Sequence, residues 1–268
     1  MPRLCLSVLL LCCALCGSGQ TAEGDAEIQS GWRELSRLNP VPAEKLFASV
    51  HSREARLGAA LATFTIQPHT SARREEAQRL LADLIEENPD DDYGIAATYY
   101  RTRLSTEGSP PADTLTTINA YRQLLHEHPG NPIAELAAPK LAILLLYADV
   151  TAELWEAHVA EITALLPQLV SPATQRDTRL ALADALLRLH SDHARALPLI
   201  AYCLDRDLIV RPPRRGNLLL QAAESARLLH QPQEAIRYYR RYLEEYPREF
   251  RTDEITRRLQ ALETEAGP

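Results

Sequence analysis

Apolar residues along most of the chain recur at intervals of three and four, which is the period of an amphipathic α-helix. Within residues 76–88, charged side chains occupy one helical face, and the opposite face carries Ala77, Leu80, Leu81, Leu84 and Ile85. Clusters of Pro, Gly, Asn and Asp interrupt this pattern at short intervals, as helix ends require. We find no useful run of the period-two alternation that indicates a β-strand. The pattern therefore predicts an all-α protein.

The blocks between these breaks predict twelve helices joined by short turns. They are expected near residues 31–38, 42–66, 71–87, 92–105, 113–127, 132–147, 151–166, 173–190, 193–205, 215–229, 232–246 and 251–264. Because short turns bring consecutive helices side by side, we expect them to stack as antiparallel pairs.

Three of the predicted helices end alike, each as an amphipathic segment closed by a proline. The segments are LLADLIEENP at 80–89, AYRQLLHEHP at 120–129 and IRYYRRYLEEYP at 236–247. Pro89 and Pro129 are 40 residues apart, and Pro129 and Pro167 are 38 residues apart. A period near 40 that spans two helices each time predicts a solenoid of helical hairpins.

The spacing inside these segments resembles that of the tetratricopeptide repeat (TPR). In that family the second helix of a hairpin carries a small residue, with aromatic and small residues four and seven positions later and a proline after twelve. A small residue lets two helices approach closely, and the proline turns the chain toward the next hairpin. The residues at these repeat-packing positions are Ala77, Leu81, Leu84 and Pro89, then Thr117, Tyr121, Leu124 and Pro129, and finally Ala235, Tyr239, Tyr242 and Pro247.

The resemblance covers roughly residues 50–265 and is strongest at 216–249. It implies a right-handed solenoid of five or six antiparallel helix hairpins, with degenerate repeats of about 34–45 residues. It also implies a concave groove, lined by the first helix of each pair, that binds protein or peptide partners. The candidate groove residues are Thr98, Arg101, Thr102, Asn217, Leu220, Glu224 and Arg227. Arg101 and Arg227 are suited to a two-pronged contact with a carboxylate or a peptide C-terminus, whereas a solvated helix face is the alternative interpretation of each residue.

Residues 1–19, MPRLCLSVLLLCCALCGSG, have a different character. One early arginine, an apolar run from Leu4 to Leu15 and a small-residue exit are typical of a secretory signal peptide cleaved after Gly19. An uncleaved anchor or a buried first helix is the alternative. We therefore expect an exported protein of the bacterial periplasm or cell envelope, with a flexible polar lead at 20–30 and a repeat domain at 31–268.

Export changes the meaning of the five cysteines. Four of them lie within residues 1–19, which leaves Cys203 alone in an apolar stretch, where a small buried hydrophobe is expected rather than a disulfide. Cys16 is a possible lipidation site, as in bacterial lipoproteins, although Leu15 stands where a small residue is usual. Membrane contact is expected only if Cys16 is lipidated.

The net charge and the sequence motifs argue against nucleic-acid binding and against catalysis. A net charge of -7 disfavours nucleic-acid binding, so the run from Arg237 to Tyr242 is interpreted as a packing face flanked by solvated arginines. No nucleotide-binding, metal-ligand or nucleophile motif is present, so neither a cofactor nor a metal is predicted. The prediction is a non-catalytic scaffold or adaptor. The alternatives are a lipid-anchored subunit of an envelope assembly complex and an enzyme or accessory domain acting on envelope glycans.

Overall fold

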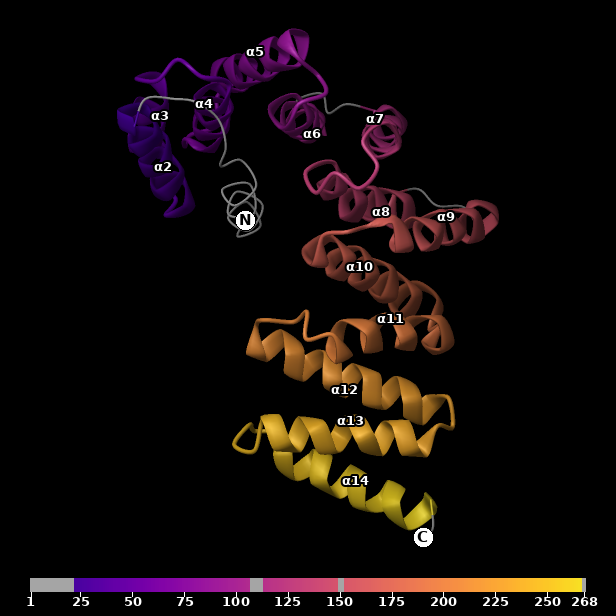
Figure 1. Ribbon diagram of the computed structural model, residues 1–268. Coiled ribbons are helices and arrows are strands. Elements are labelled where there is room, and N and C mark those ends of the chain that lie inside the picture. Colours follow the sequence, from indigo (N-terminus) through magenta and orange to yellow (C-terminus); the bar gives the residue numbers. More distant parts are fainter. Residues whose placement is uncertain (1–21, 107–112, 149–151, 267–268) are drawn as a thin grey trace. The chain divides into compact units, whose positions relative to one another are not determined.

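The computed structural model describes residues 22–106, 113–148 and 152–266 (Figure 1). In these ranges the chain forms thirteen α-helices and two short 3-10 helices, η1 and η2, without a strand. The α-helices are α2 Ala22–Ser36, α3 Pro40–Ala48, α4 Arg53–Thr65, α5 Ser71–Glu87, α6 Asp92–Thr106, α7 Thr114–Glu127, α8 Ala137–Tyr147, α9 Ala152–Leu165, α10 Pro172–His190, α11 His193–Asp205, α12 Pro212–Leu228, α13 Pro232–Glu245 and α14 Thr252–Ala266. The predicted all-α, TPR-like solenoid fold is confirmed, because neighbouring helices pack against each other along the chain.

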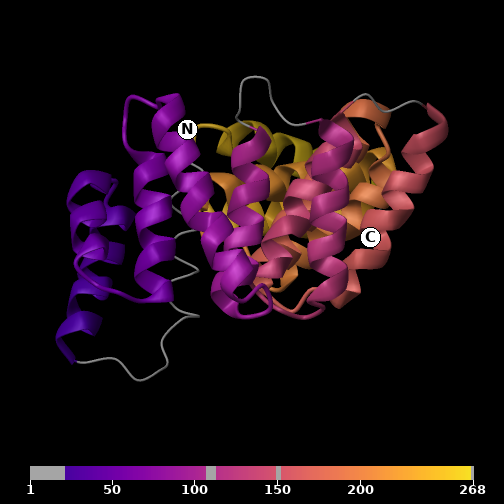
Figure 2. The ribbon, with the colours of Figure 1, turned by 90° about the horizontal axis from the view of Figure 1, so that it is seen from above.

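The contacts divide the chain into two compact units, one ending at Leu141 and the other beginning at Ala142. In the first unit, helices α2 to α7 pack in chain order, and α4 also contacts both α2 and α6. Alternate helices are therefore neighbours, as in stacked hairpins (Figure 2). In the second unit, α9 to α14 pack each against the next.

Arg53 connects one hairpin of the first unit to the next through hydrogen bonds. Its Nη2 donates to the carbonyl oxygens of Leu84 (3.0 Å) and Asn88 (2.9 Å) and to Oδ1 of Asp91 (2.8 Å). The same Asp91 oxygen accepts from the backbone N–H of Gly94 at 2.7 Å, which satisfies a free donor at the start of α6. One guanidinium thus joins α4 to the end of α5 and the beginning of α6.

The second unit repeats with an even period. Helices α10, α12 and α14 begin at Pro172, Pro212 and Thr252, 40 residues apart in each case. Pro at the first helical position suits the start of α10 and α12, because its missing N–H would have no partner there. The period near 40 that the prolines indicated is therefore the spacing of complete hairpins.

Two expectations about the first residues of the repeat domain were wrong. Residues 22–30, expected to be a flexible lead, belong to α2, where Ile28, Trp32 and Leu35 are buried at helical spacing. The single helix expected at 42–66 is two helices, α3 and α4. Ser52 begins the second of them, since its hydroxyl accepts from the Ala55 N–H at 3.1 Å. The break has neither Pro nor Gly, and the periodicity therefore missed it.

Other boundaries shift by less. The helix expected at 132–147 begins as η1, Ala134–Leu136, where the Asn131 side chain accepts from the N–H groups of Ile133 and Ala134. The predicted signal peptide at 1–19 and Cys16 lie outside the described residues.

We predict that Gly94→Ala destabilises the protein by about 1–3 kcal/mol, because the added methyl group would overlap the backbone carbonyl of Asn88. Gly216→Ala is the matched control. Its methyl group would meet Tyr242 at an ordinary 3.4 Å, and the higher helix propensity of Ala should leave stability unchanged or raise it by up to ~1 kcal/mol. Urea unfolding followed by circular dichroism measures both variants. Equal stability of the two would contradict the close approach at Gly94.

Candidate functional site

The repeat-packing residues lie inside the molecule. The side chains at the nine non-proline positions are all buried: Ala77, Leu81, Leu84, Thr117, Tyr121, Leu124, Ala235, Tyr239 and Tyr242. The three prolines, Pro89, Pro129 and Pro247, are exposed and follow the ends of α5, α7 and α13. Any binding surface must therefore use other helix faces.

One such face runs along α12 and carries Asn217, Leu220, Glu224 and Arg227, which we call the α12 stripe. Asn217 and Arg227 are exposed, and the other two are half-buried. Helix α14 reaches this stripe from one side. Nη1 of Arg251, just before α14, donates to Oδ1 of Asn217 at 2.8 Å, and Nη1 of Arg258 lies 3.9 Å from Oε2 of Glu224. The structure thus brings all four predicted residues onto one helix face, next to two arginines that were not predicted.

Glu224 is the electrostatic centre of the α12 stripe. Its two carboxylate oxygens accept from Nε (3.0 Å) and Nη2 (2.6 Å) of Arg227, and Oε2 also accepts from the Tyr239 hydroxyl at 3.2 Å. These bonds, led by that of Arg227, lower the pKa of Glu224, and the same pair raises the pKa of Arg227. A ligand carboxylate would therefore have to compete with Glu224 for Arg227.

The second predicted group, Thr98, Arg101 and Thr102, lies on α6 in the first unit. The Thr98 hydroxyl donates to the Gly94 carbonyl at 3.0 Å, and the Thr102 hydroxyl donates to the Thr98 carbonyl at 2.9 Å. Both threonines are thus half-buried and bonded within their own helix, whereas Arg101 is exposed. The α6 group and the α12 stripe belong to different units, so each is a separate candidate surface.

The Arg- and Tyr-rich run on α13 is a packing face. Tyr238, Tyr239 and Tyr242 are all buried. The intervening arginines pair with carboxylates: Arg237 with Glu234 at 2.7 Å, and Arg241 with Glu245 at 3.0 Å. The bases of a nucleic acid therefore have no exposed tyrosine ring here on which to stack.

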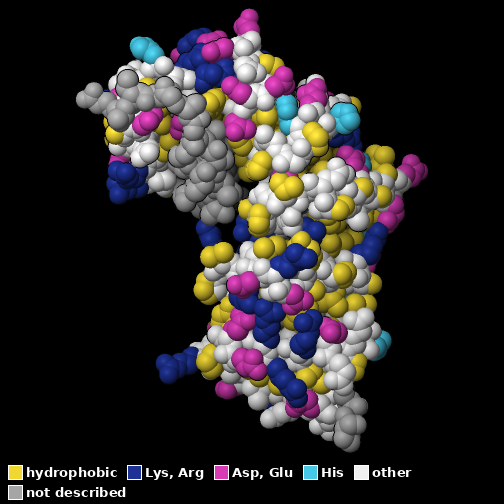
Figure 3. All heavy atoms as spheres, in the orientation of Figure 1, with side chains coloured by type: hydrophobic (Ala, Val, Ile, Leu, Met, Phe, Trp, Pro, Cys, Tyr) yellow, Lys and Arg dark blue, Asp and Glu magenta, His cyan; other side chains and the backbone are white. Residues whose placement is uncertain are grey.

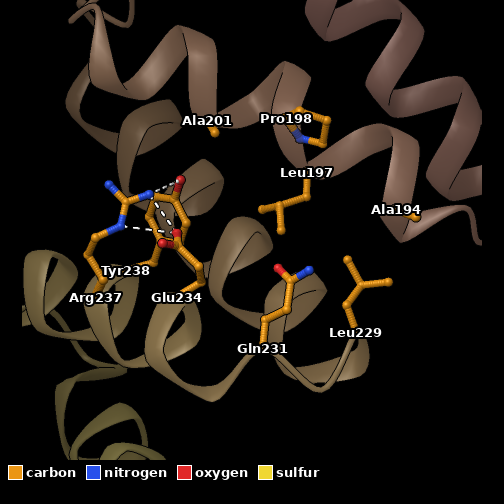
Figure 4. Close-up of a pocket in the computed structure, with 9 residues that line it drawn as sticks. All are labelled: Ala194, Leu197, Pro198, Ala201, Leu229, Gln231, Glu234, Arg237 and Tyr238. Atoms are coloured by element: carbon orange, nitrogen blue, oxygen red, sulfur yellow. Dashed lines mark hydrogen bonds and ion pairs between the residues drawn. The ribbon is translucent and has the colours of Figure 1, made fainter.

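A shallow cavity that the sequence did not indicate lies between α11 and α13 (Figure 4). It has a volume of about 370 Å³ and an apolar wall that includes Leu197 and Leu229. The Arg237 guanidinium donates to Glu234 and to the Tyr238 hydroxyl at one end of it. Its origin is a row of small side chains on α11, Ala194, Pro198 and Ala201. In the sequence, the spacing of these small residues by four and three positions is the only feature that indicates the cavity.

The first unit contains one half-buried carboxylate that bridges three helices. Oε1 of Glu54, on α4, accepts from Nε1 of Trp32 on α2 at 2.8 Å, and Oε2 accepts from the Tyr93 hydroxyl on α6 at 3.4 Å. Burial raises the pKa of Glu54 more than these hydrogen bonds lower it. The nearby Asp25 carboxylate raises the pKa of Glu54 further, and the two hydrogen bonds of Glu54 join α4 to α2 and to α6.

Candidate chemistry is sparse elsewhere in the part of the chain that the structure describes. Cys203 is fully buried, and burial raises the pKa of its thiol to about 11, which disfavours the reactive thiolate. Within the described ranges, no three His, Cys, Asp or Glu side chains gather as metal ligands would. None of the described helices is both long and apolar enough to span a bilayer.

Comparison with known families agrees with this geometry. Residues 218–248, which comprise most of α12 and all of α13, match the tetratricopeptide-repeat family. No curated protein matches the chain. The chain is therefore TPR-like, and TPR hairpins generally serve as non-catalytic scaffolds for protein–protein interaction.

We expect two substitutions of Glu54 to change the stability of the protein differently. Glu54→Gln keeps an oxygen for Trp32 Nε1 and removes a charge that burial penalises, so stability at neutral pH should stay the same or rise slightly. Glu54→Ala leaves the indole N–H without its partner and should cost about 1–3 kcal/mol.

Urea unfolding at several pH values measures both. Because the raised pKa means that the folded state favours the protonated carboxyl, any gain of Glu54→Gln should shrink as pH falls through that pKa. A gain that grows toward acid pH would contradict the raised pKa.

Proposed function

We propose that this protein is an exported, non-catalytic adaptor of the bacterial cell envelope that binds a protein or peptide partner along the α12 stripe. The observation that carries the proposal is the match of α12 and α13 to the tetratricopeptide repeat, together with a polar helix face that the packing of α13 leaves accessible.

The chemistry of the α12 stripe suits a peptide that carries both signs of charge. Leu220 offers a half-buried apolar contact one turn before Glu224 on the same helix face. Because Glu224 and Arg227 are already paired at 2.6 Å, a partner gains most by exchanging this pair for one bond to each charge. A partner with a single carboxylate would leave Glu224 without its main donor.

A photocrosslinking experiment tests the partner site. The photoreactive residue p-benzoylphenylalanine is placed at Leu220 in the full chain, and adducts formed in intact cells are mapped by mass spectrometry. The matched control position is Thr264, which is exposed on α14. We expect discrete protein adducts from position 220 and none from 264. Addition of Arg227→Ala should weaken the adduct, because one of the two paired charges is lost.

Equal crosslinking at both positions would show that contact is not specific to the α12 stripe. Adducts from neither position, in a chain that folds normally, would reject the stripe as the partner site.

The export proposal is supported by the composition of residues 1–19 and has a separate test. Mass spectrometry of the protein from fractionated envelope should find a mature chain that begins at Gln20. A lipid-modified chain that begins at Cys16 would instead favour the lipid-anchored alternative. A chain that retains Met1 and stays in the cytoplasm would contradict export.

A further inference from the structure

Three loops of the second unit each expose one apolar side chain. Val170, Val210 and Phe250 stand two residues before the first residue of α10, α12 and α14, and they are 40 residues apart in sequence. Their side chains are 54 %, 83 % and 88 % exposed, and the last two are the most exposed large hydrophobic residues of the described chain. Exposure recurs at the same place in each repeat, so it is a property of the repeat.

The three loops lie at one end of the second unit. Arg176, in the first turns of α10, donates from Nη1 to the Leu208 carbonyl in the loop before α12 at 3.4 Å. The Tyr246 hydroxyl, after α13, donates to the Pro212 carbonyl at 2.8 Å. The first bond ties α10 to the loop before α12, and the second ties the loop before α14 to the start of α12. Figure 1 shows the three loops on the same side of the second unit. We call this end, residues 169–171, 206–214 and 246–251, the loop edge.

The exposed side chains are held outward by buried neighbours. Leu169 and Ile209, which directly precede Val170 and Val210, are both buried. In the third loop, Glu249 takes the corresponding position and accepts from the buried Tyr242 hydroxyl at 2.7 Å. In each loop an inward-facing residue thus precedes the exposed apolar side chain, which we call the tip of the loop: Val170, Val210 and Phe250. The tips cannot turn inward while the preceding residues keep their inward contacts.

Positive charge accompanies the tips. Arg211, Arg214 and Arg248 are exposed, and none of them pairs with a carboxylate among the residues that the structure describes. Two carboxylates of these loops are engaged, Asp207 by Arg215 at 2.6 Å and Glu249 by Arg251 at 3.2 Å. Figure 3 shows basic and hydrophobic side chains projecting together over the loops that precede α12 and α14. An unpaired basic surface in a chain of net charge -7 indicates an anionic partner.

We propose that the loop edge binds the surface of an anionic phospholipid membrane. Val210 and Phe250 would enter the interface, and the guanidinium groups of Arg211, Arg214 and Arg248 would contact lipid phosphates. The arrangement favours a membrane over an acidic protein. The three loops lie on the same side of the second unit (Figure 1), where one planar surface can reach them together, whereas the cavity between α11 and α13 includes none of these residues. This contact would need no lipid on Cys16, and it is therefore a proposal separate from the expected lipidation.

The experiment uses the full chain and vesicles of pure phosphatidylcholine or of equal parts phosphatidylcholine and phosphatidylglycerol. Sedimentation measures binding, and hydrogen exchange with mass spectrometry reports where the protein is protected. We expect tighter binding to the anionic vesicles, lost at high salt, with protection of residues 206–211 and 246–251. The local readout separates the loop edge from residues 4–15, which all variants share.

Two variants test the charges and the tips. The triple variant Arg211→Gln, Arg214→Gln and Arg248→Gln should weaken the binding that is specific to anionic vesicles by about a hundredfold. The double variant Val210→Ser and Phe250→Ser should weaken it severalfold. Each has a control with the same change of residue type at exposed positions elsewhere: Arg33→Gln, Arg37→Gln and Arg188→Gln for the charges, and Leu38→Ser with Leu115→Ser for the tips.

Equal binding by the edge variants and their controls would overturn the proposal, as would vesicle binding without protection of the two loops. Protection by poly-glutamate but not by vesicles would assign the loop edge to an acidic protein instead. Circular dichroism of every variant confirms that the chain is folded before binding is compared.

Discussion

The buried Tyr242 connects α13 to the loop before α14 and, through that loop, to α12. It is fully buried on α13, and its ring stacks on Tyr246 with 5.4 Å between centroids. Its hydroxyl cannot remain unbonded in this position, and Glu249 accepts it at 2.7 Å. Glu249 in turn holds Arg251, which reaches Asn217 on α12. One buried aromatic residue therefore positions both the loop before α14 and one end of the α12 stripe.

The pairing of arginines divides the surface into two kinds. On the α12 stripe the charges are neutralised internally, since Glu224 receives Arg227, Arg258 and the Tyr239 hydroxyl. Exposed ion pairs of this sort contribute little to stability, and they can exchange with a charged partner at small cost. At the loop edge, by contrast, Arg211 and Arg248 form no ion pair with a carboxylate of the described ranges. The first surface suits a partner with complementary charges of both signs, and the second suits one that is uniformly negative.

Periodicity predicted the regular helices closely. The segments expected at 71–87 and 193–205 are α5 and α11 with the same boundaries. It failed where a capping side chain rather than a breaker residue begins a helix, as Ser52 does for α4, because capping is a hydrogen-bond geometry that apolar spacing does not report. It also failed for the first half of α2, whose polar residues concealed the buried Ile28. A few apolar contacts to neighbouring helices suffice to order such a segment.

The sequence by itself determined the helical class, the period near 40 and the buried identity of residues such as Ala235 and Tyr239, because each depends on local spacing along one helix. Only the tertiary structure decided which exposed groups meet. Val170, Val210 and Phe250 are far apart in the chain and share one edge, since the alternate helices α10, α12 and α14 run in the same direction. The engagement of Arg227 by Glu224 likewise follows from which side chains are within reach in three dimensions, as does the lack of a carboxylate partner for Arg211 among the residues described. Local spacing sets what is buried, and hairpin stacking sets what the surface can bind.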